Sequence, residues 1–200
     1  KGFYDRYVPH VPMAHLEEWF HTRFNEVQHT VEELPHARDF LEYCRAEKIR
    51  TFVLSTIHPE HFREQTKKNG FHQYLDHPYL GIWDKRTCIQ QLIGEHALDP
   101  QETLFIGDMQ HDVETARHGG VWSCAVLTGF NRLGQLRESK PDLIVEHLGE
   151  LHDILRRQVP VFTKEPSQNR ASLMPVITVG ALIFNERDEV LMVRTHLDRL

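Results

Sequence analysis

The sequence lacks the features that mark several large classes of protein. It contains no apolar run near the roughly 20 residues that span a bilayer and no pattern typical of a signal peptide. Its three cysteines, Cys44, Cys88 and Cys124, are odd in number and far apart. This spacing argues against a disulfide framework or a zinc site. Together these absences predict a cytoplasmic protein with reduced thiols and no membrane partner.

Positive charge is also scarce. The 200 residues hold 23 Lys and Arg against 29 Asp and Glu, a formal net charge of -6. A protein that reads duplex nucleic acid normally presents a basic patch, so nucleic acid is not an expected partner. The 40% hydrophobic and 26% charged content is ordinary for a globular chain, and the length allows one domain and part of a second.

Apolar runs alternate with amphipathic stretches through the middle of the chain. The pattern predicts strands at residues 50–55, 103–107, 122–129 and 142–145, and helices at residues 37–48, 60–70, 86–98, 112–120 and 148–158. Strands that are apolar throughout and alternate with helices indicate a parallel sheet covered on both faces. The expected fold is therefore α/β, with a Rossmann-like parallel sheet.

The two ends of the chain follow other patterns. Residues 1–30 carry apolar and aromatic side chains at helical spacing, and residues 158–174 mix Pro, Ser, Asn and charge as a linker does. From residue 175, two β-rich runs flank the polar turn "NERDE", which predicts a hairpin too short to form its own core. We therefore expect four parts: 1–30, 31–157, 158–174 and 175–200.

Polar residues that suit phosphate chemistry follow the predicted strands. Ser55 and Thr56 end the first strand, Asp108 ends the strand at residues 103–107, and Asp112 lies one helical turn later; Lys85 stands just before the helix that leads to this strand. Ligands of parallel sheets bind at the carboxyl ends of the strands. A hydroxyl and an ammonium suit phosphate oxygens, and carboxylates suit Mg2+.

Each of these residues also has a simpler interpretation. Asp108 could cap the following helix and Asp112 could be a first-turn acid favoured by the helix dipole. Ser55 is common turn chemistry, and Lys85 could be a solvated surface lysine. Only the combination at one edge of the sheet favours a phosphate and metal site.

Four segments, "FVLST", "DKRTCI", "GDMQHD" and "PDLIVEHLGELHDIL", together resemble the haloacid dehalogenase-like hydrolases, in particular their phosphoglycolate phosphatase-like branch. The resemblance covers about residues 31 to 155. It implies that Ser55 and Lys85 are catalytic and, with Thr56, bind phosphate. It also implies that Asp108 is a Mg2+ ligand and that Asp112 supports the metal directly or through water.

The same resemblance implies a fold and a reaction. Residues 1–30 resemble the tail of the family's helical cap domain, and residues 31–157 its core. The implied activity is Mg2+-dependent hydrolysis of a small phosphorylated metabolite through an aspartyl-phosphate.

One family motif is absent from the 200 residues. The family's first motif is Asp-x-Asp at the end of the first strand, and no two aspartates here are two residues apart. The simplest account is an excerpt whose upstream part is missing. Because that strand lies in the middle of the family's sheet, its loss is expected to leave two groups of strands with unpaired edges.

The C-terminal segment "VITVGALIFNERDEVLMVRTH" resembles the opening strands of Nudix hydrolases, although the Nudix box is absent. This resemblance implies a bifunctional parent protein in which a phosphatase is joined to a Nudix pyrophosphohydrolase.

Two alternatives remain open at this stage. The core could be a non-catalytic binding or regulatory module attached to an active Nudix hydrolase. A receiver-like domain of the response-regulator type also places acids and a lysine at the rim of a parallel sheet, although its paired acids would lie early in the chain.

We predict that residues 1–200 alone neither fold stably nor hydrolyse phosphomonoesters, because the central strand and its aspartates are missing. Thermal unfolding and a phosphatase assay of the purified 200 residues test this. A cooperative melt together with full turnover would contradict it.

Overall fold

The computed structural model describes residues 10–157, 176–179, 183–184 and 190–191. The chain divides into two compact units, Lys1–Val31 and Glu32–Leu200. The second unit contains a six-stranded sheet of order β2-β1-β6-β3-β4-β5, in which every pairing is parallel. Its strands are β1 (Phe52–Leu54), β2 (His77–Tyr79), β3 (Thr103–Gly107), β4 (Trp122–Val126), β5 (Leu143–Val145) and β6 (Val176–Val179). The α/β fold with a parallel sheet is thus confirmed.

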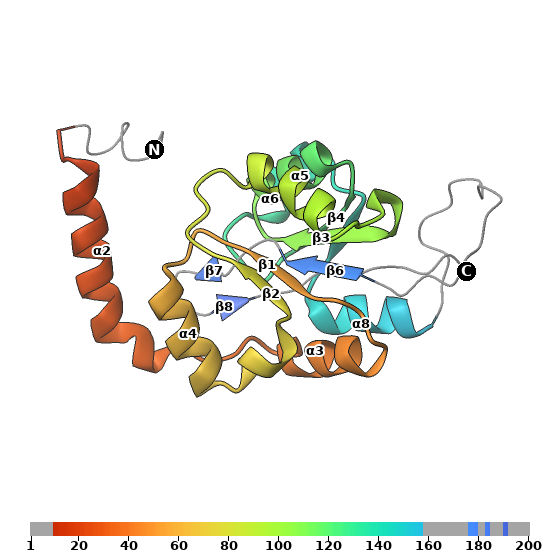
Figure 1. Ribbon diagram of the computed structural model, residues 1–200, viewed down its shortest axis with the longest axis horizontal. Coiled ribbons are helices and arrows are strands. Elements are labelled where there is room, and N and C mark those ends of the chain that lie inside the picture. The colour runs from red at the N-terminus through yellow and green to blue at the C-terminus, as the bar shows by residue number, and fades with distance from the viewer. Residues whose placement is uncertain (1–9, 158–175, 180–182, 185–189, 192–200) are drawn as a thin grey trace. The chain divides into compact units, whose positions relative to one another are not determined.

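Helices cover both faces of this sheet, as Figure 1 shows. The helices α5 and α6 lie on one face, and α3 and α8 lie on the other. The helices of this unit are α3 (Ala37–Ala46), α4 (Pro59–Lys68), α5 (Lys85–Glu95), α6 (Gln110–Gly119), α7 (Leu133–Glu138) and α8 (Leu148–Arg156), with short 3-10 turns η2 (Phe71–Tyr74) and η3 (Pro100–Glu102).

The strands β1 and β3 form where the sequence is mostly apolar. Every residue of β1 and β3 is buried, as expected for strands covered on both faces. The sequence did not predict β2, which contains Pro78, nor the short helix α7. Proline cannot donate a ladder hydrogen bond and is therefore confined to strand edges; β2 is indeed an edge strand of the sheet.

Local signals set the helix ends. The Asp84 side chain accepts a hydrogen bond from the backbone N–H of Arg86 (3.1 Å) and so caps α5. Helix α6 ends at Gly119, and the C-cap residue Gly120 has a φ of 66°, the left-handed conformation that glycine adopts readily. The helix predicted at residues 86–98 stops earlier: α5 ends at Glu95, and Ala97 has a φ of 48°.

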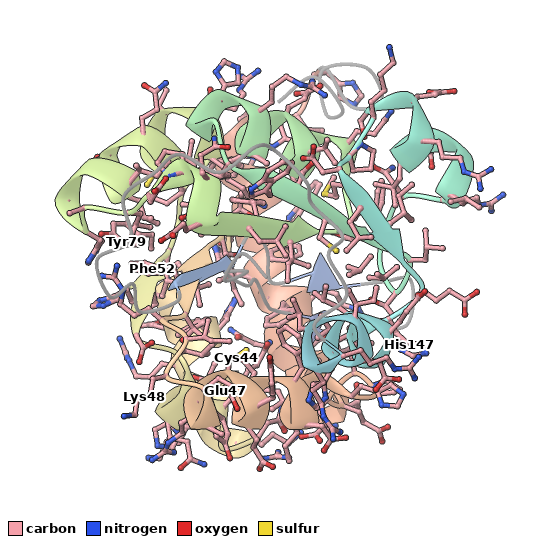
Figure 2. The ribbon with its side chains drawn as sticks, turned by 90° about the vertical axis from the view of Figure 1, so that its right-hand side faces the viewer. Cys44, Glu47, Lys48, Phe52, Tyr79 and His147 are labelled. Atoms are coloured by element: carbon pink, nitrogen blue, oxygen red, sulfur yellow. The ribbon has the colours of Figure 1, made fainter. Side chains whose placement is uncertain are left out.

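The core lies on both sides of the sheet. On one side α3 buries Phe40, Leu41 and Cys44 against the sheet and α8, as its spacing predicted. Glu47 and Lys48 follow the end of α3, and Phe52 and Tyr79 stand on the neighbouring strands β1 and β2 (Figure 2). On the other side, residues of α5 and α6 pack on β1 and β3.

The first unit contains α2 (Met13–Val27) and the 3-10 turn η1 (Gln28–Thr30). The helical spacing expected here is present, but its aromatic residues have different environments. Phe24 is buried, whereas Trp19 and Phe20 are 61% and 52% exposed. Among the described residues, no helix combines the length and apolar character needed to cross a membrane.

The central position of the sheet is filled by β6. Its backbone pairs with β3 from Thr103↔Val176 to Ile106↔Val179 and with β1 at Val53↔Val179. The expectation of two strand groups with unpaired edges is therefore wrong for this structure. Unpaired strand edges therefore give no reason to expect that residues 1–200 are unstable. The absence of the Asp-x-Asp motif remains a reason to expect that they are inactive.

The strands expected to begin a separate C-terminal domain are thus divided. β6 lies in the main sheet, whereas β7 (Ile183–Phe184) and β8 (Val190–Leu191) pair antiparallel around the predicted turn. All of residues 158–174, the expected linker, lie outside the described residues, as do the other residues of the 175–200 segment.

We predict that Phe40→Ala lowers the free energy of unfolding by about 3–5 kcal/mol, because it leaves a cavity at a fully buried position. Urea unfolding of the complete protein measures this. Glu64→Ala, on the exposed face of α4, is the control and should change stability by less than about 0.5 kcal/mol. Equal effects of the two substitutions would show that α3 does not support the core.

Candidate active site

Asp108 lies directly after β3 and is fully buried. It does not cap α6, because the N-cap position belongs to Met109. Its Oδ2 instead accepts a hydrogen bond from the backbone N–H of Phe130, in the loop that follows β4. Its Oδ1 is buried and has no hydrogen-bond partner among the described residues. Such an oxygen is costly unless a ligand satisfies it.

A buried ion pair joins the two neighbouring helices. Lys85, the first residue of α5, places its Nζ 2.7 Å from Oδ1 of Asp112 in the first turn of α6. The two side chains are 7% and 2% exposed. The surface interpretation of Lys85 is therefore wrong: the ammonium is held inside the protein.

Asp112 also has the structural role that the sequence left open. Its Oδ2 accepts the backbone N–H of Met109 (3.1 Å) and so caps the start of α6. Because both of its oxygens already accept hydrogen bonds, these contacts favour Asp112 as the residue that holds Lys85 and supports a metal indirectly.

Two glycines allow this close packing. A Cβ at Gly129 would come closer than 3.0 Å to the Asp108 side chain, and a Cβ at Gly107 would do the same to Asp112. Asn131 continues the Gly129 loop: its N–H donates to the Asp108 carbonyl (3.2 Å), and its Oδ1 accepts the N–H of Gln110 (2.8 Å). The loop after β4 therefore fixes the position of Asp108.

The charges of the buried groups at the carboxyl ends of the strands do not balance. Burial first, and then the negative charge of Asp112, raises the pKa of Asp108 to about 7. The hydrogen bond from Phe130 and the charge of Lys85 act in the opposite direction. One buried ammonium thus faces two buried carboxyl groups, and a cation would stabilise the ionised form of Asp108.

The two hydroxyl residues lie further along the same edge. Ser55 is buried at the end of β1; its Oγ accepts the N–H of Ile57 (3.1 Å), whereas Thr56 is exposed. Because β6 separates β1 from β3, Ser55 and Asp108 stand on strands about 10 Å apart. An ion pair thus joins Lys85 to Asp112, with Asp108 beside them, and the two hydroxyl residues follow β1 on the far side of β6.

The donor set fits Mg2+. The described residues contain no cluster of three or more His, Cys, Asp or Glu that could enclose a metal. Mg2+ does not need such a cluster, since it keeps several waters and is commonly held by one or two carboxylates together with substrate phosphate. The unsatisfied Oδ1 of Asp108 is the oxygen best suited to contact it.

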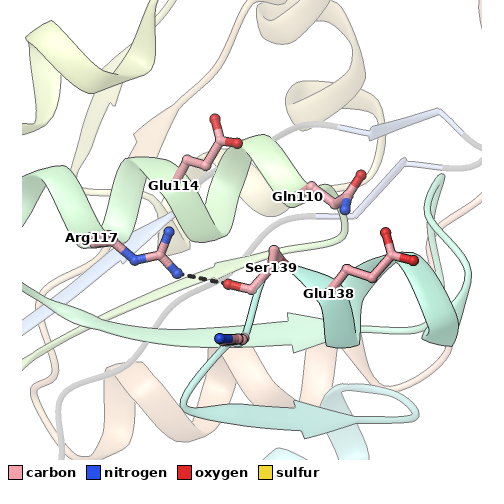
Figure 3. A pocket seen from close by; sticks show the side chains of 6 residues that line it. Gln110, Glu114, Arg117, Glu138 and Ser139 are labelled. Carbon is pink, nitrogen blue, oxygen red and sulfur yellow. Dashed lines mark hydrogen bonds between the residues drawn. The ribbon is translucent and has the colours of Figure 1, made fainter.

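A separate pocket of about 540 Å³ lies between α6 and the end of α7 (Figure 3). Arg117 donates a hydrogen bond to the carbonyl of Ser139 there (2.7 Å), beside Glu114 and Glu138. None of the expected site residues lines it, so it is not part of the phosphate site.

The backbone contacts around Asp108 were not predicted from the sequence. Gly129, Phe130 and Asn131 act mainly through their N–H groups and through the missing Cβ. The only available signal was a Gly-containing loop directly after a buried strand, which is a common place for a close approach to a ligand.

Comparison with known proteins identifies the family of the chain. The family model of the haloacid dehalogenase-like hydrolases matches residues 6–126. Phosphoglycolate phosphatase from Synechococcus elongatus is 27% identical over 119 residues, which are 58% of this chain and 56% of that protein. The enzyme of the same name from Aliivibrio fischeri is 23% identical over 71% of this chain and 63% of its own length.

Solved structures show the same fold. The haloacid dehalogenase-like hydrolase from Streptococcus pneumoniae has a TM-score of 0.53 at 24% identity, over 60% of this chain and 58% of that one. A predicted phosphatase from Clostridium acetobutylicum has a TM-score of 0.57 at 18% identity, over 62% and 59%.

The chain belongs to the haloacid dehalogenase-like hydrolase family. Within it, the chain is similar to phosphoglycolate phosphatases, of which it spans 56% and 63% of the length in the two cases above. The family match decides against the receiver-like alternative.

The raised pKa of Asp108 predicts a pH-dependent loss of stability in metal-free protein. The folded chain keeps a proton up to about pH 7, whereas the unfolded carboxyl, with a pKa of 3.8, has already released it. The free energy of unfolding therefore falls as pH rises between these values. Asp108→Asn has no carboxyl group to titrate at this position and so does not show this loss. The free energy of unfolding of the variant minus that of wild type should therefore be larger at pH 7.5 than at pH 4.5, by more than about 1 kcal/mol.

Urea unfolding in chelator at the two pH values measures this difference. Asp153→Asn, which changes an exposed carboxylate on α8, is the matched control and should show no such increase. A stability difference for Asp108→Asn that does not change with pH would mean that Asp108 titrates normally.

Proposed function

We propose that the chain contains the core of a Mg2+-dependent phosphatase that hydrolyses a small phosphorylated metabolite, such as a phosphoglycolate-like compound. The observation that carries this proposal is the buried, partly unsatisfied Asp108 beside the buried Lys85–Asp112 pair at the carboxyl edge of the sheet. The similarity to phosphoglycolate phosphatases supports the substrate class.

The proposed reaction has two steps. An aspartate of the Asp-x-Asp motif that the family resemblance implies, outside these 200 residues, attacks phosphorus and forms an aspartyl-phosphate, while the ester's alkoxide leaves and takes a proton from the second aspartate of that motif. Water then gives a proton to this second aspartate as it attacks the aspartyl-phosphate, which releases inorganic phosphate and restores the carboxylate. The residues described here position and neutralise the transferring group rather than react with it.

Each residue has a separate task in this proposal. Lys85 offers a fixed positive charge to the phosphoryl oxygens, and Asp112 holds its ammonium in place. The hydroxyl of Ser55 donates a hydrogen bond to a further phosphoryl oxygen, and Thr56 also contacts the phosphate. Bound Mg2+, held by Asp108 and supported by Asp112, would supply additional positive charge for the same oxygens.

We further propose that the β7–β8 hairpin within residues 175–200 belongs to a Nudix-like domain, whereas β6 of the same segment pairs in the main sheet. The parent protein would then join two phosphorus-bond hydrolases. The antiparallel pairing of β7 with β8 supports a hairpin at this position. A cytoplasmic location is proposed from the three cysteines, all of which are free and buried.

We predict that Lys85→Ala and Asp108→Asn in the complete protein each reduce kcat for phosphomonoester hydrolysis by roughly 10²-fold or more, the usual effect of removing a group that stabilises transition-state charge. Steady-state assays with 2-phosphoglycolate and phenyl phosphate in the presence of Mg2+ measure this. Lys67→Ala, an exposed lysine on α4, is the matched control and should retain wild-type rates. Near-normal rates in both site variants would place the chemistry elsewhere.

A non-catalytic binding or regulatory module attached to an active Nudix hydrolase is the second candidate. The residues before Lys1 discriminate between the two candidates: an intact Asp-x-Asp pair there supports the phosphatase, and its loss supports the regulatory module. Pyrophosphate-bond hydrolysis by the complete protein without any phosphomonoester hydrolysis would support this candidate over the phosphatase.

A further inference from the structure

Two large aromatic side chains of the second unit are exposed among its described residues. Trp83 is 64% exposed and Phe130 is 62% exposed. A single exposed aromatic residue is common and needs no explanation. These two are notable because each lies in a loop whose backbone donates a hydrogen bond to a residue of the candidate site.

The Trp83 loop connects β2 to α5. Ile82, directly before it, donates its N–H to the carbonyl of Ser55 (2.9 Å). Asp84, directly after it, caps α5 and pairs with the Arg86 guanidinium at 2.9 and 3.0 Å. Lys85 follows at once. The backbone on both sides of Trp83 is therefore fixed, while its indole stays exposed.

The Phe130 loop connects β4 to α7. The N–H of Phe130 donates to Oδ2 of Asp108, and the N–H of the next residue, Asn131, donates to the Asp108 carbonyl. The Phe130 backbone is thus part of the buried site, although its ring is exposed. Both aromatic loops leave the carboxyl ends of their strands and so stand at the same edge of the sheet.

The polar groups at this edge are already assigned to the phosphoryl group. Lys85, Asp108 and Ser55 are buried, and Arg86, in the first turn of α5, is paired with Asp84. The organic part of a phosphomonoester extends away from buried phosphate-binding groups toward the exposed loops. The aromatic faces there suit an apolar or ring-bearing group better than an anionic one.

We propose that Trp83 and Phe130 contact the leaving group and so widen the substrate range from small phosphoglycolate-like compounds to phosphomonoesters whose leaving group has an apolar or ring face. This inference rests on the proposed phosphatase function and extends its substrate class. It does not assign either aromatic residue a role in the chemical step.

The test compares two substrates in the complete protein, phenyl phosphate and 2-phosphoglycolate. Trp83→Ala and Phe130→Ala should each raise KM for phenyl phosphate roughly fivefold, the ratio produced by losing about 1 kcal/mol of aromatic contact. Inhibition by inorganic phosphate, and kcat/KM for 2-phosphoglycolate, should stay within about twofold of wild type. Trp83→Phe should restore most of the phenyl phosphate affinity.

Trp122→Phe is the control, because Trp122 begins β4 at the opposite edge of the sheet; it should leave both KM values unchanged. An unchanged KM for phenyl phosphate in both alanine variants, with Lys85→Ala still inactive, overturns this inference and leaves the phosphatase proposal standing. A wild-type protein that hydrolyses neither substrate overturns both.

Discussion

The buried Lys85–Asp112 pair is the interaction on which the rest of this edge depends. It links the first turns of α5 and α6 at 2.7 Å. Its lysine lowers the pKa of the second buried carboxyl group, Asp108, whereas its aspartate raises that pKa. Removing one member of such a pair leaves the other charge buried and uncompensated, which typically costs about 3–5 kcal/mol. Apolar residues of similar volume can often replace a buried ion pair without loss of stability, and for this reason we propose that these charges serve binding.

Most of the central fold could be predicted from local patterns. The runs at β1, β3 and β4 are apolar throughout, which is typical of strands buried on both faces, and α3 has an unambiguous amphipathic stripe. β2 was missed because Pro78 interrupts a very short segment. The position of β6 could not be predicted, since it depends on pairing with β1 and β3, which are distant in the chain, and not on the alternation of residues within β6 itself.

The site was predictable in part. Asp108, Asp112 and Lys85 were found because they stand at the ends of predicted strands and helices on one edge of the sheet, and the resemblance to a family then implied their roles. The structure adds how they are held. The sequence could not show that Oδ2 of Asp112 caps α6, or that a backbone N–H from a loop 22 residues away contacts Asp108. Backbone donors carry no side-chain signature, so any residue type except proline at position 130 could have supplied the same N–H group.

The central claim is that Asp108 is held ready for a divalent cation beside a buried lysine. Isothermal titration calorimetry of Mg2+ into the complete protein tests it most directly, because it needs neither substrate nor turnover. The account predicts saturable Mg2+ binding to wild type. Asp108→Asn should weaken this binding at least about tenfold, the lower end of what loss of a metal ligand or its support costs, and Asp153→Asn should leave it unchanged. Equal Mg2+ affinity in wild type and Asp108→Asn would contradict it.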